Sequence, residues 1–267
     1  MIISNVTEHM SSILFEIKDR VAFITLNRPD KLNAFNREMA LVLQNRLDEC
    51  ASLHEVRAVY LTGAGKAFSA GQDLAEVVDP AGPGMEKILS EQYNPIITRI
   101  RNLPKPVVAA VNGVAAGAGA NIALSCDIVV ASKSASFIQA FSKIGLIPDS
   151  GGTWFLPRLV GWQKAMGIAM LGDKIGAEEA ERMGMVYKVV EDEKFLEISK
   201  GLVVTLGGAA TKALAYTKHA FNYSAANSLE EQLLLEDELQ QKSAQTKDHA
   251  EGIKAFLEKR DPQFTGE

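Results

Sequence analysis

Residues 105–127 read KPVVAAVNGVAAGAGANIALSCD, and this stretch decides the fold. A Lys-Pro pair is followed by the apolar run 107–111, which is typical of a buried strand. An Asn-Gly pair interrupts that run, and small residues around Gly117 then lead into an apolar segment that begins a buried helix. The stretch therefore predicts a strand, a turn of small residues and the N-terminus of a helix.

The predicted helix N-terminus is open to a ligand. Its first N–H groups have no partner within the helix and lie at the positive end of the helix dipole. With Gly117, Ala118 and Gly119 there, no bulky side chain keeps a ligand from the backbone. Such a turn binds an anion or a developing oxyanion, or it merely lets the helix pack closely on the strand. A dinucleotide fingerprint is excluded because Ile122 stands where that motif needs glycine.

Composition narrows the class of protein. The 267 residues carry a net charge of −5 and no basic block, so we expect no nucleic acid partner. No stretch of 18 apolar residues occurs, so no membrane span is expected. Cys50 and Cys126 have no metal-ligand spacing, and no metal site is predicted. Free cysteines and the lack of a visible signal peptide favour a cytoplasmic location.

The remaining segments alternate between strand and helix signals. The β-type runs 13–17 and 21–26 predict a hairpin, and Asn36 is expected to cap a helix that extends to about residue 51. A second helix is predicted over 85–101, whereas 141–161 indicates a loop. After that loop the chain is predicted to be helical, apart from a strand at 186–190. These helices are expected at 163–171, 177–183, 195–206, 209–226, 229–244 and 247–259.

A second stretch of small residues, AFSAGQDL, occupies residues 67–74 and follows a predicted strand at 56–61. Ligands of α/β sheets usually lie at the carboxyl ends of strands, so this loop is a candidate binding segment, or else an ordinary connection. Ser69 is not a nucleophile elbow, because Ala67 stands where that motif needs glycine. Residues 77–84 contain two prolines and two glycines and are expected to form a mobile lid.

Three carboxylates lie beside these turns of small residues. Asp127 begins a predicted strand and is interpreted as a structural cap, and Asp73 is expected to bond its own backbone or to act in catalysis. Asp149 lies among apolar residues, which would raise its pKa and suit it to general acid–base work. Its alternative role is to accept hydrogen bonds from the Gly151-Gly152 turn.

Three segments in this order resemble the crotonase, or enoyl-CoA hydratase/isomerase, superfamily: residues 67–74, 105–127 and 145–161. The resemblance extends from about residue 13 to the C-terminus. It implies an α/β fold, a crotonase-like spiral of ββα turns with a C-terminal helical trimerisation region. We therefore expect a core at 1–206 that holds the acyl-CoA site and an oligomerisation region at 207–267. A homotrimer or a dimer of trimers is implied.

The resemblance also implies an acyl-CoA thioester substrate and no separate cofactor, since coenzyme A is part of that substrate. The backbone N–H groups of Gln72 and Ala118 are implied to hold the thioester oxygen as it becomes an enolate, with Asp149 as acid and base. The residues implied to bind substrate are Arg28, Ala70, Gly71, Asp73, Leu74, Gly117 and Phe141. The CoA phosphates are expected near basic side chains such as Arg28 or Lys31.

The sequence departs from the hydratases at two positions. Their water-activating glutamates map onto Asn121 and Phe141, neither of which can act as a base. The resemblance thus favours an isomerase, most similar to those that convert ring-1,2-epoxyphenylacetyl-CoA to oxepin-CoA and shift 3-enoyl double bonds to the 2 position. The alternatives are a Δ3,Δ2-enoyl-CoA isomerase or hydratase of fatty-acid oxidation, and a catalytically dead acyl-CoA-binding scaffold. Association with a hydratase of the same pathway is a further expectation.

Overall fold

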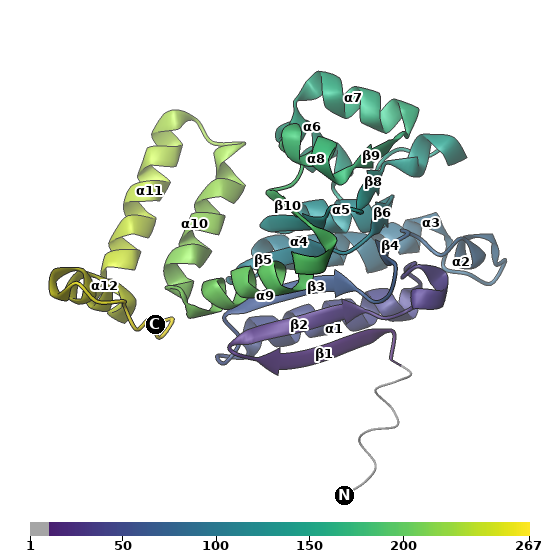
Figure 1. Cartoon of the computed structure of the whole chain (residues 1–267). Coiled ribbons are helices and arrows are strands. Elements are labelled where there is room, and N and C mark those ends of the chain that lie inside the picture. Colours follow the sequence, from purple (N-terminus) through teal and green to yellow (C-terminus); the bar gives the residue numbers. More distant parts are fainter. Residues whose placement is uncertain (1–10) are drawn as a thin grey trace, which may run out of the picture.

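The computed structural model describes residues 11–267, and within them the chain forms two β-sheets flanked by helices (Figure 1). In the larger sheet a hairpin of β1 and β2 is extended by parallel strands, in the order β1-β2-β3-β5-β7-β10. The strands are β1 (Ile13–Lys18), β2 (Val21–Leu26), β3 (Ala58–Gly63), β5 (Val107–Val111), β7 (Ile128–Ser132) and β10 (Lys188–Val190). The predicted hairpin is confirmed, and Asp19 and Arg20 turn it with positive φ angles.

The second sheet has the order β4-β6-β8-β9 and lies beside the first. Its strands are β4 (Ala67–Ser69), β6 (Val114–Ala116), β8 (Ser136–Ile138) and β9 (Lys174–Gly176). The chain passes from β3 to β4, from β5 to β6 and from β7 to β8, so each turn adds one strand to each sheet before a helix follows. This repetition confirms the predicted spiral of ββα turns.

Helices cover both faces of the large sheet. On one face lies α1 (Arg37–Ser52), which begins at Asn36 as predicted: the Asn36 side chain accepts a hydrogen bond from the Met39 N–H. On the other face α9 (Asp192–Gly208) packs Phe195 and Val203 against the central strands. Strands buried on both sides explain the continuous Val and Ala run of β5.

The predicted helix at 85–101 is confirmed, with a wider turn in its middle. It comprises α3 (Gly84–Lys87), a π-helical segment η3 (Ile88–Tyr93) and α4 (Asn94–Asn102). Pro95 has no N–H to donate to the Glu91 carbonyl one turn earlier. The Gln44 side chain of α1 supplies the missing donor, 2.8 Å from that carbonyl oxygen. The π-helical segment ends at Tyr93, a residue of the candidate site below.

The predicted loop at 141–161 is wrong in its second half. The chain forms the 3₁₀ turn η4 (Ala140–Ile144) and, after the Ser150-Gly151 turn, the helix α6 (Gly152–Val160). The helix α6 accommodates Pro157 in its interior and buries Phe155 and Leu156. Further along lie α7 (Trp162–Leu171) and α8 (Ala177–Arg182), close to their predicted bounds.

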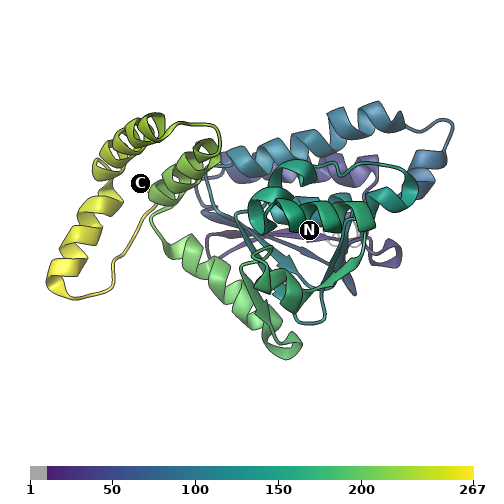
Figure 2. The same ribbon diagram turned by 90° about the horizontal axis from the view of Figure 1, so that it is seen from above.

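The last helices extend away from the two sheets, as Figures 1 and 2 show. They are α10 (Thr211–Ser224), α11 (Leu229–Ala244) and α12 (Lys247–Glu258). Gly207 and Gly208 do not separate helices as predicted, because α9 continues through both. Gly207 is needed for packing instead: a Cβ there would lie 3.2 Å from the Val21 side chain. The division at residue 206 stays a prediction, and its first ten residues lie outside the described range.

Buried polar contacts attach these helices to the spiral. Lys218 of α10 donates to Asp127, which also accepts from the Val107 N–H at the start of β5, both at 2.8 Å. Asp127 is therefore the structural residue that the sequence suggested. Arg57 donates to Thr211 Oγ1 at 2.9 Å and to the Phe264 carbonyl at 2.9 Å. Within residues 11–267 none of the helices is long and apolar enough to cross a membrane.

Candidate active site

The loop after β4 presents a free backbone N–H. Gln72 forms a parallel bridge with Phe35, in which the Phe35 N–H donates to Gly71 and the Asp73 N–H donates to Phe35, at 2.7 and 2.8 Å. Since such a bridge engages only the residues on either side of Gln72, its own N–H points away from Phe35. Among residues 11–267 this N–H finds no acceptor.

A second free N–H belongs to Ala118, the first residue of α5 (Ala118–Ser125). Gly117 ties the turn to β8 by donating to the Ile138 carbonyl at 2.9 Å, while the Ala118 N–H has no acceptor in the described part of the chain. Gly71 brings the two loops together: a Cβ there would lie 2.8 Å from the Ala116 oxygen and 3.4 Å from the Ala118 nitrogen. This close approach and a φ of +92° both require glycine.

Both loops border a cavity of about 240 Å³. Most of its lining is apolar, and among the lining residues Lys143 and Asp149 are the charged ones. The predicted residues that line it are Ala70, Gly71, Gln72, Leu74, Gly117, Ala118, Phe141 and Asp149. The others are Val77, Met85, Ile88, Tyr93, Ala140, Lys143, Ile144 and Leu146.

Asp149 is half-buried at one side of this cavity, and burial raises the pKa of its carboxyl group. Ser150 donates a 2.8 Å hydrogen bond to Asp149 Oδ1, and its backbone has a positive φ of 50°. The turn does not use the carboxylate in the way the alternative suggested, because the Gly152 N–H donates to the main-chain oxygen of Asp149. The carboxyl group thus remains available to a ligand in the cavity.

Arg28 and Asp73 lie outside the cavity lining. Their side chains form an ion pair at 2.8 Å, and Arg28 also donates to the Ala34 carbonyl. Asp73 accepts from the Ala75 N–H and so caps α2 (Leu74–Val78), which takes up part of the predicted lid. The ion pair thus links the loop that contains Gln72 to the segment around Ala34. Contact of Arg28 or Asp73 with substrate stays a prediction.

Tyr93 is a residue of the site that sequence reasoning missed. Its hydroxyl donates to Gln72 Oε1 at 2.8 Å, and Gln72 Nε2 donates to Glu76 Oε2 at 2.8 Å. Burial, reinforced by the charge of Asp149, raises the pKa of Tyr93 well above its usual value, so the hydroxyl stays a donor. The sequence around Tyr93 predicts a helix and gives no indication that this side chain contacts the site.

Buried polar residues support the same loop from below. Asn33 is fully buried and donates to the Ala67 and Ala64 carbonyls at 2.8 and 2.9 Å. Ser69 is also fully buried and donates to the Asn33 carbonyl at 2.8 Å. Neither residue shows a sequence motif that would have identified it, since these contacts join segments more than thirty residues apart.

Phe141 and Asn121, the two positions onto which the resemblance maps the hydratase glutamates, lie near this region. Phe141 is buried, and its ring lies 3.8 Å from the point that a Cβ of Gly117 would occupy. Asn121 is fully buried on α5 and does not line the cavity. Asp149 is therefore the carboxylate that the cavity lining provides.

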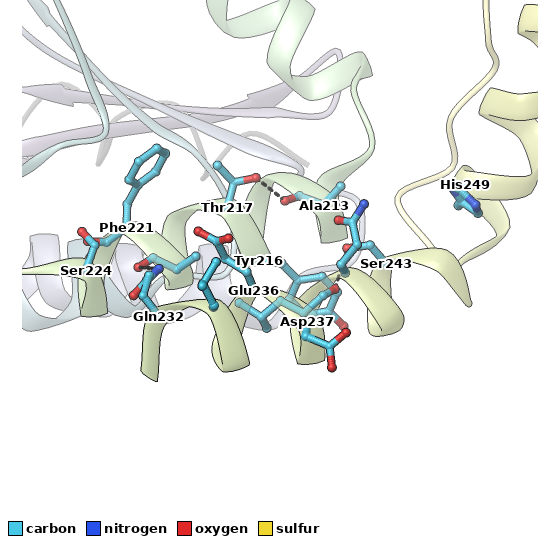
Figure 3. A pocket seen from close by; sticks show the side chains of 14 residues that line it. Ala213, Tyr216, Thr217, Phe221, Ser224, Gln232, Glu236, Asp237, Ser243 and His249 are labelled. Carbon is cyan, nitrogen blue, oxygen red and sulfur yellow. Dashed lines mark hydrogen bonds between the residues drawn. The ribbon is translucent and has the colours of Figure 1, made fainter. Parts of the chain in front are cut away.

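A second cavity of about 800 Å³ lies between α10 and α11 (Figure 3). Tyr216, Phe221 and Leu233 contribute its apolar surface, and Glu236 and Asp237 contribute acids. Phe221 is 71% exposed, which is unusual for a large aromatic side chain. Within residues 11–267, neither cavity nor any other place gathers three or more His, Cys, Asp or Glu side chains that could hold a metal ion.

Comparison with known proteins gives a consistent assignment. The family model described as enoyl-CoA hydratase/isomerase matches residues 16–267. A protein of Escherichia coli K12 named 1,2-epoxyphenylacetyl-CoA isomerase is 47% identical over 96% of this chain and 99% of its own length. A Rhodobacter capsulatus protein named "probable enoyl-CoA hydratase" is also 47% identical, over 96% of this chain and 98% of its own.

Solved structures agree on the fold. The crystal structure of an enoyl-CoA hydratase from Bacillus anthracis superimposes with a TM-score of 0.89 at 34% sequence identity. The superposition covers 96% of this chain and 100% of that one. The likeness therefore extends over nearly the whole length of both chains.

Proposed function

The chain belongs to the enoyl-CoA hydratase/isomerase family of enzymes, and on that premise we propose that it is an acyl-CoA isomerase with Asp149 as its acid and base. Its substrates are ring-1,2-epoxyphenylacetyl-CoA, which it converts to oxepin-CoA, and 3-enoyl-CoA, whose double bond it shifts to the 2 position.

One arrangement supports this proposal more than any other. The cavity is lined by a single carboxylate, Asp149, and by two backbone N–H donors, those of Gln72 and Ala118. Hydration needs a second group to hold and activate water, whereas moving a proton between two carbons of one substrate needs only one group that takes and returns it. The buried ring of Phe141 restricts the space for water beside Gly117.

The chemistry follows from these groups. The thioester oxygen accepts hydrogen bonds from the Gln72 and Ala118 N–H groups, and this lowers the energy of the enolate that forms when C2 loses a proton. Asp149 takes that proton from C2 of a 3-enoyl-CoA and returns it to C4, which leaves the double bond between C2 and C3. A carboxyl group with a raised pKa is suited to both halves of the transfer.

The apolar wall of the cavity suits a ring or a short acyl chain. Val77, Met85, Ile88, Ile144 and Leu146 line it, and the E. coli relative named above is an epoxyphenylacetyl-CoA isomerase. Outside the cavity the CoA phosphates need cations. The guanidinium of Arg28 is already bonded to Asp73 and Ala34, so exposed Lys31 and Lys143 are the better positioned candidates.

The C-terminal helices are proposed to form the contacts of a homotrimer or a dimer of trimers. Their large apolar side chains are exposed in the single chain, among them Leu234 at 71% and Phe256 at 83%. Isolated chains seldom leave such surface uncovered, since burying it against another copy removes it from water.

The deciding experiment is incubation with enzymatically made ring-1,2-epoxyphenylacetyl-CoA and, separately, with a 3-enoyl-CoA and crotonyl-CoA. Conversion of the first two without a change in mass, together with little hydration of crotonyl-CoA, is the expected result. Brisk hydration of crotonyl-CoA would favour the fatty-acid hydratase that the R. capsulatus relative's name suggests. Binding of acyl-CoA with no conversion would leave the non-catalytic scaffold.

A further inference from the structure

Asn121 joins the two parts of the candidate site. It lies on α5 three residues after Ala118, whose N–H is one of the two oxyanion donors. Its side chain donates from Nδ2 to the main-chain oxygen of Asp149 at 2.8 Å. A single buried side chain therefore links the helix that carries a donor to the turn that carries the acid.

The orientation of this amide is fixed by its partners. A main-chain carbonyl oxygen can only accept, so Asn121 must present its nitrogen to Asp149 and its oxygen to Gln139. Gln139 Nε2 donates to Asn121 Oδ1 at 2.7 Å, and both side chains are almost fully buried, at 0% and 2% exposure. Buried hydrogen bonds of this kind hold a single arrangement, because breaking one leaves an unsatisfied polar group.

Packing restricts the same residue further. A Cβ added to Gly152 would come within 2.3 Å of Asn121 Nδ2, so the amide lies directly on the backbone that follows Asp149. The Gly152 N–H donates to the same Asp149 oxygen at 2.7 Å. That oxygen thus has two donors, one from its own turn and one from α5.

We propose that Asn121 is a positioning residue that sets the place of the Asp149 carboxyl group relative to the oxyanion donors of Gln72 and Ala118, with Gln139 holding it in turn. This role rests on the proposed isomerase function. It also explains what replaced the glutamate that hydratases carry at this position. An ionised glutamate would offer only acceptors to the Asp149 carbonyl, which can itself only accept.

The test compares Asn121→Leu, Gln139→Leu and the double variant with the unmodified chain. Leucine has nearly the shape of asparagine but offers no hydrogen bonds. Because a displacement of about 1 Å in a reacting group can cost about 100-fold in rate, Asn121→Leu is expected to lower kcat for 3-enoyl-CoA by about 10- to 100-fold. Binding of a saturated acyl-CoA should stay unchanged, since neither Gln72 nor Ala118 is altered.

The double variant should lose no more than Asn121→Leu alone, because Gln139 acts through Asn121. Ser125→Ala is the matched control: it removes a buried hydroxyl from the same helix that bonds only the Ile122 carbonyl, and activity should be retained. If Asn121→Leu does not fold, Gln139→Leu decides, with a smaller loss of kcat expected in the same direction.

A second readout does not depend on turnover. The Asp149 carboxyl carbon can be titrated by ¹³C NMR, with Asp149→Asn as the assignment standard, and Asn121→Leu should move its pKa toward the ordinary value as the turn moves into water. An unchanged titration together with an unchanged kcat in a folded variant would overturn the positioning role. Absence of isomerisation by the unmodified chain would instead overturn the proposed function, and the titration would still decide the role of Asn121.

Discussion

The hydroxyl of Tyr93 lies 2.8 Å from the side-chain oxygen of Gln72, a residue that lines the cavity and whose backbone N–H has no acceptor among residues 11–267. The other end of the same amide donates to Glu76 at 2.8 Å. Tyr93 can donate and the Glu76 carboxylate can only accept, so the Gln72 amide has one favourable orientation. The backbone donor is thereby held from two sides, by the long helix that ends at Asn102 and by α2.

Tyr93→Phe should lower kcat by about tenfold, because a misplaced oxyanion donor stabilises the enolate less well. The ring itself still packs against Phe35, so folding should survive. Tyr60→Phe is the matched control: it removes the buried hydroxyl that bonds Ser199 on the far side of the sheet, and it should cost stability without costing kcat. Equal kcat losses in both variants would show that Tyr93 has no special role.

Ala118→Pro should abolish most turnover while leaving the chain folded. Proline removes the N–H assigned to the oxyanion and is tolerated at the first position of a helix. Loss of one such donor costs about 10²–10³ in rate. Ala118→Gly keeps the N–H and should retain activity. Steady-state kinetics beside circular dichroism would make the comparison, and an active, folded proline variant would place the oxyanion elsewhere.

Asp149→Asn should reduce isomerisation by at least about 10²-fold, since an amide cannot carry a proton between carbons. Calorimetric binding of a saturated acyl-CoA should be nearly unchanged, because the side chain keeps its size and still accepts from Ser150. A variant that keeps more than about a tenth of the activity, against the 10²-fold minimum expected of such a group, would move the role to another acid, with Asp73 the first to test.

The raised pKa of Asp149 has consequences for pH dependence. As pH falls through that pKa the base becomes protonated, so kcat/KM should decline in a range above the usual aspartate value. The same ionisation has the opposite effect on the stability of the fold. Burial disfavours the charged form in the folded state, so ionisation of Asp149 lowers the free energy of unfolding as pH rises. Asp149→Asn should therefore raise Tm at pH 7, with a difference that shrinks in acid.

Phe221→Asp should weaken self-association, because it places a charge on the apolar surface that α10 and α11 expose. Tyr187→Asp is a comparable change at a residue that is 66% exposed and lies outside the C-terminal helices. Sedimentation velocity would show smaller species for the first variant and unchanged ones for the second. If neither variant changes the assembly, the contacts between copies lie elsewhere.

Local sequence signals were sufficient to predict much of the secondary structure. The β5 strand, the α5 helix and the Asn36 cap depend on neighbouring residues and appear where they were predicted. The predicted turn between β5 and α5 is wrong in part, because Val114–Ala116 within it forms strand β6 of the second sheet. The α6 helix was not predicted, and it contains Pro157, a strong local helix breaker. The burial of Phe155 and Leu156 against the core overrides that local preference.

The parts of the site that were missed depend on distant pairs. Tyr93 and Gln72 are 21 residues apart in the sequence, and Asn33 and Ala67 are 34 apart. The spacing of apolar residues along the chain does not predict hydrogen bonds between such distant positions. The donor roles of the Gln72 and Ala118 N–H groups came from the resemblance to a family, whereas the acid–base role of Asp149 was also indicated by its apolar neighbours. The proximity of the three residues around one cavity supports these roles.

The close glycine contacts around the candidate site have a consequence for how this enzyme can diversify. Gly71 and Gly152 have no room for even one added carbon, and Gly119 would meet Ser69 at 2.6 Å. Substitutions at these three glycines should therefore be rare among the active variants of a mutational library. The walls are side chains such as Met85 and Ile144, which can be exchanged without moving the backbone. Substitutions at these lining side chains can thus change the acyl group that binds, while the residues proposed to transfer the proton stay the same.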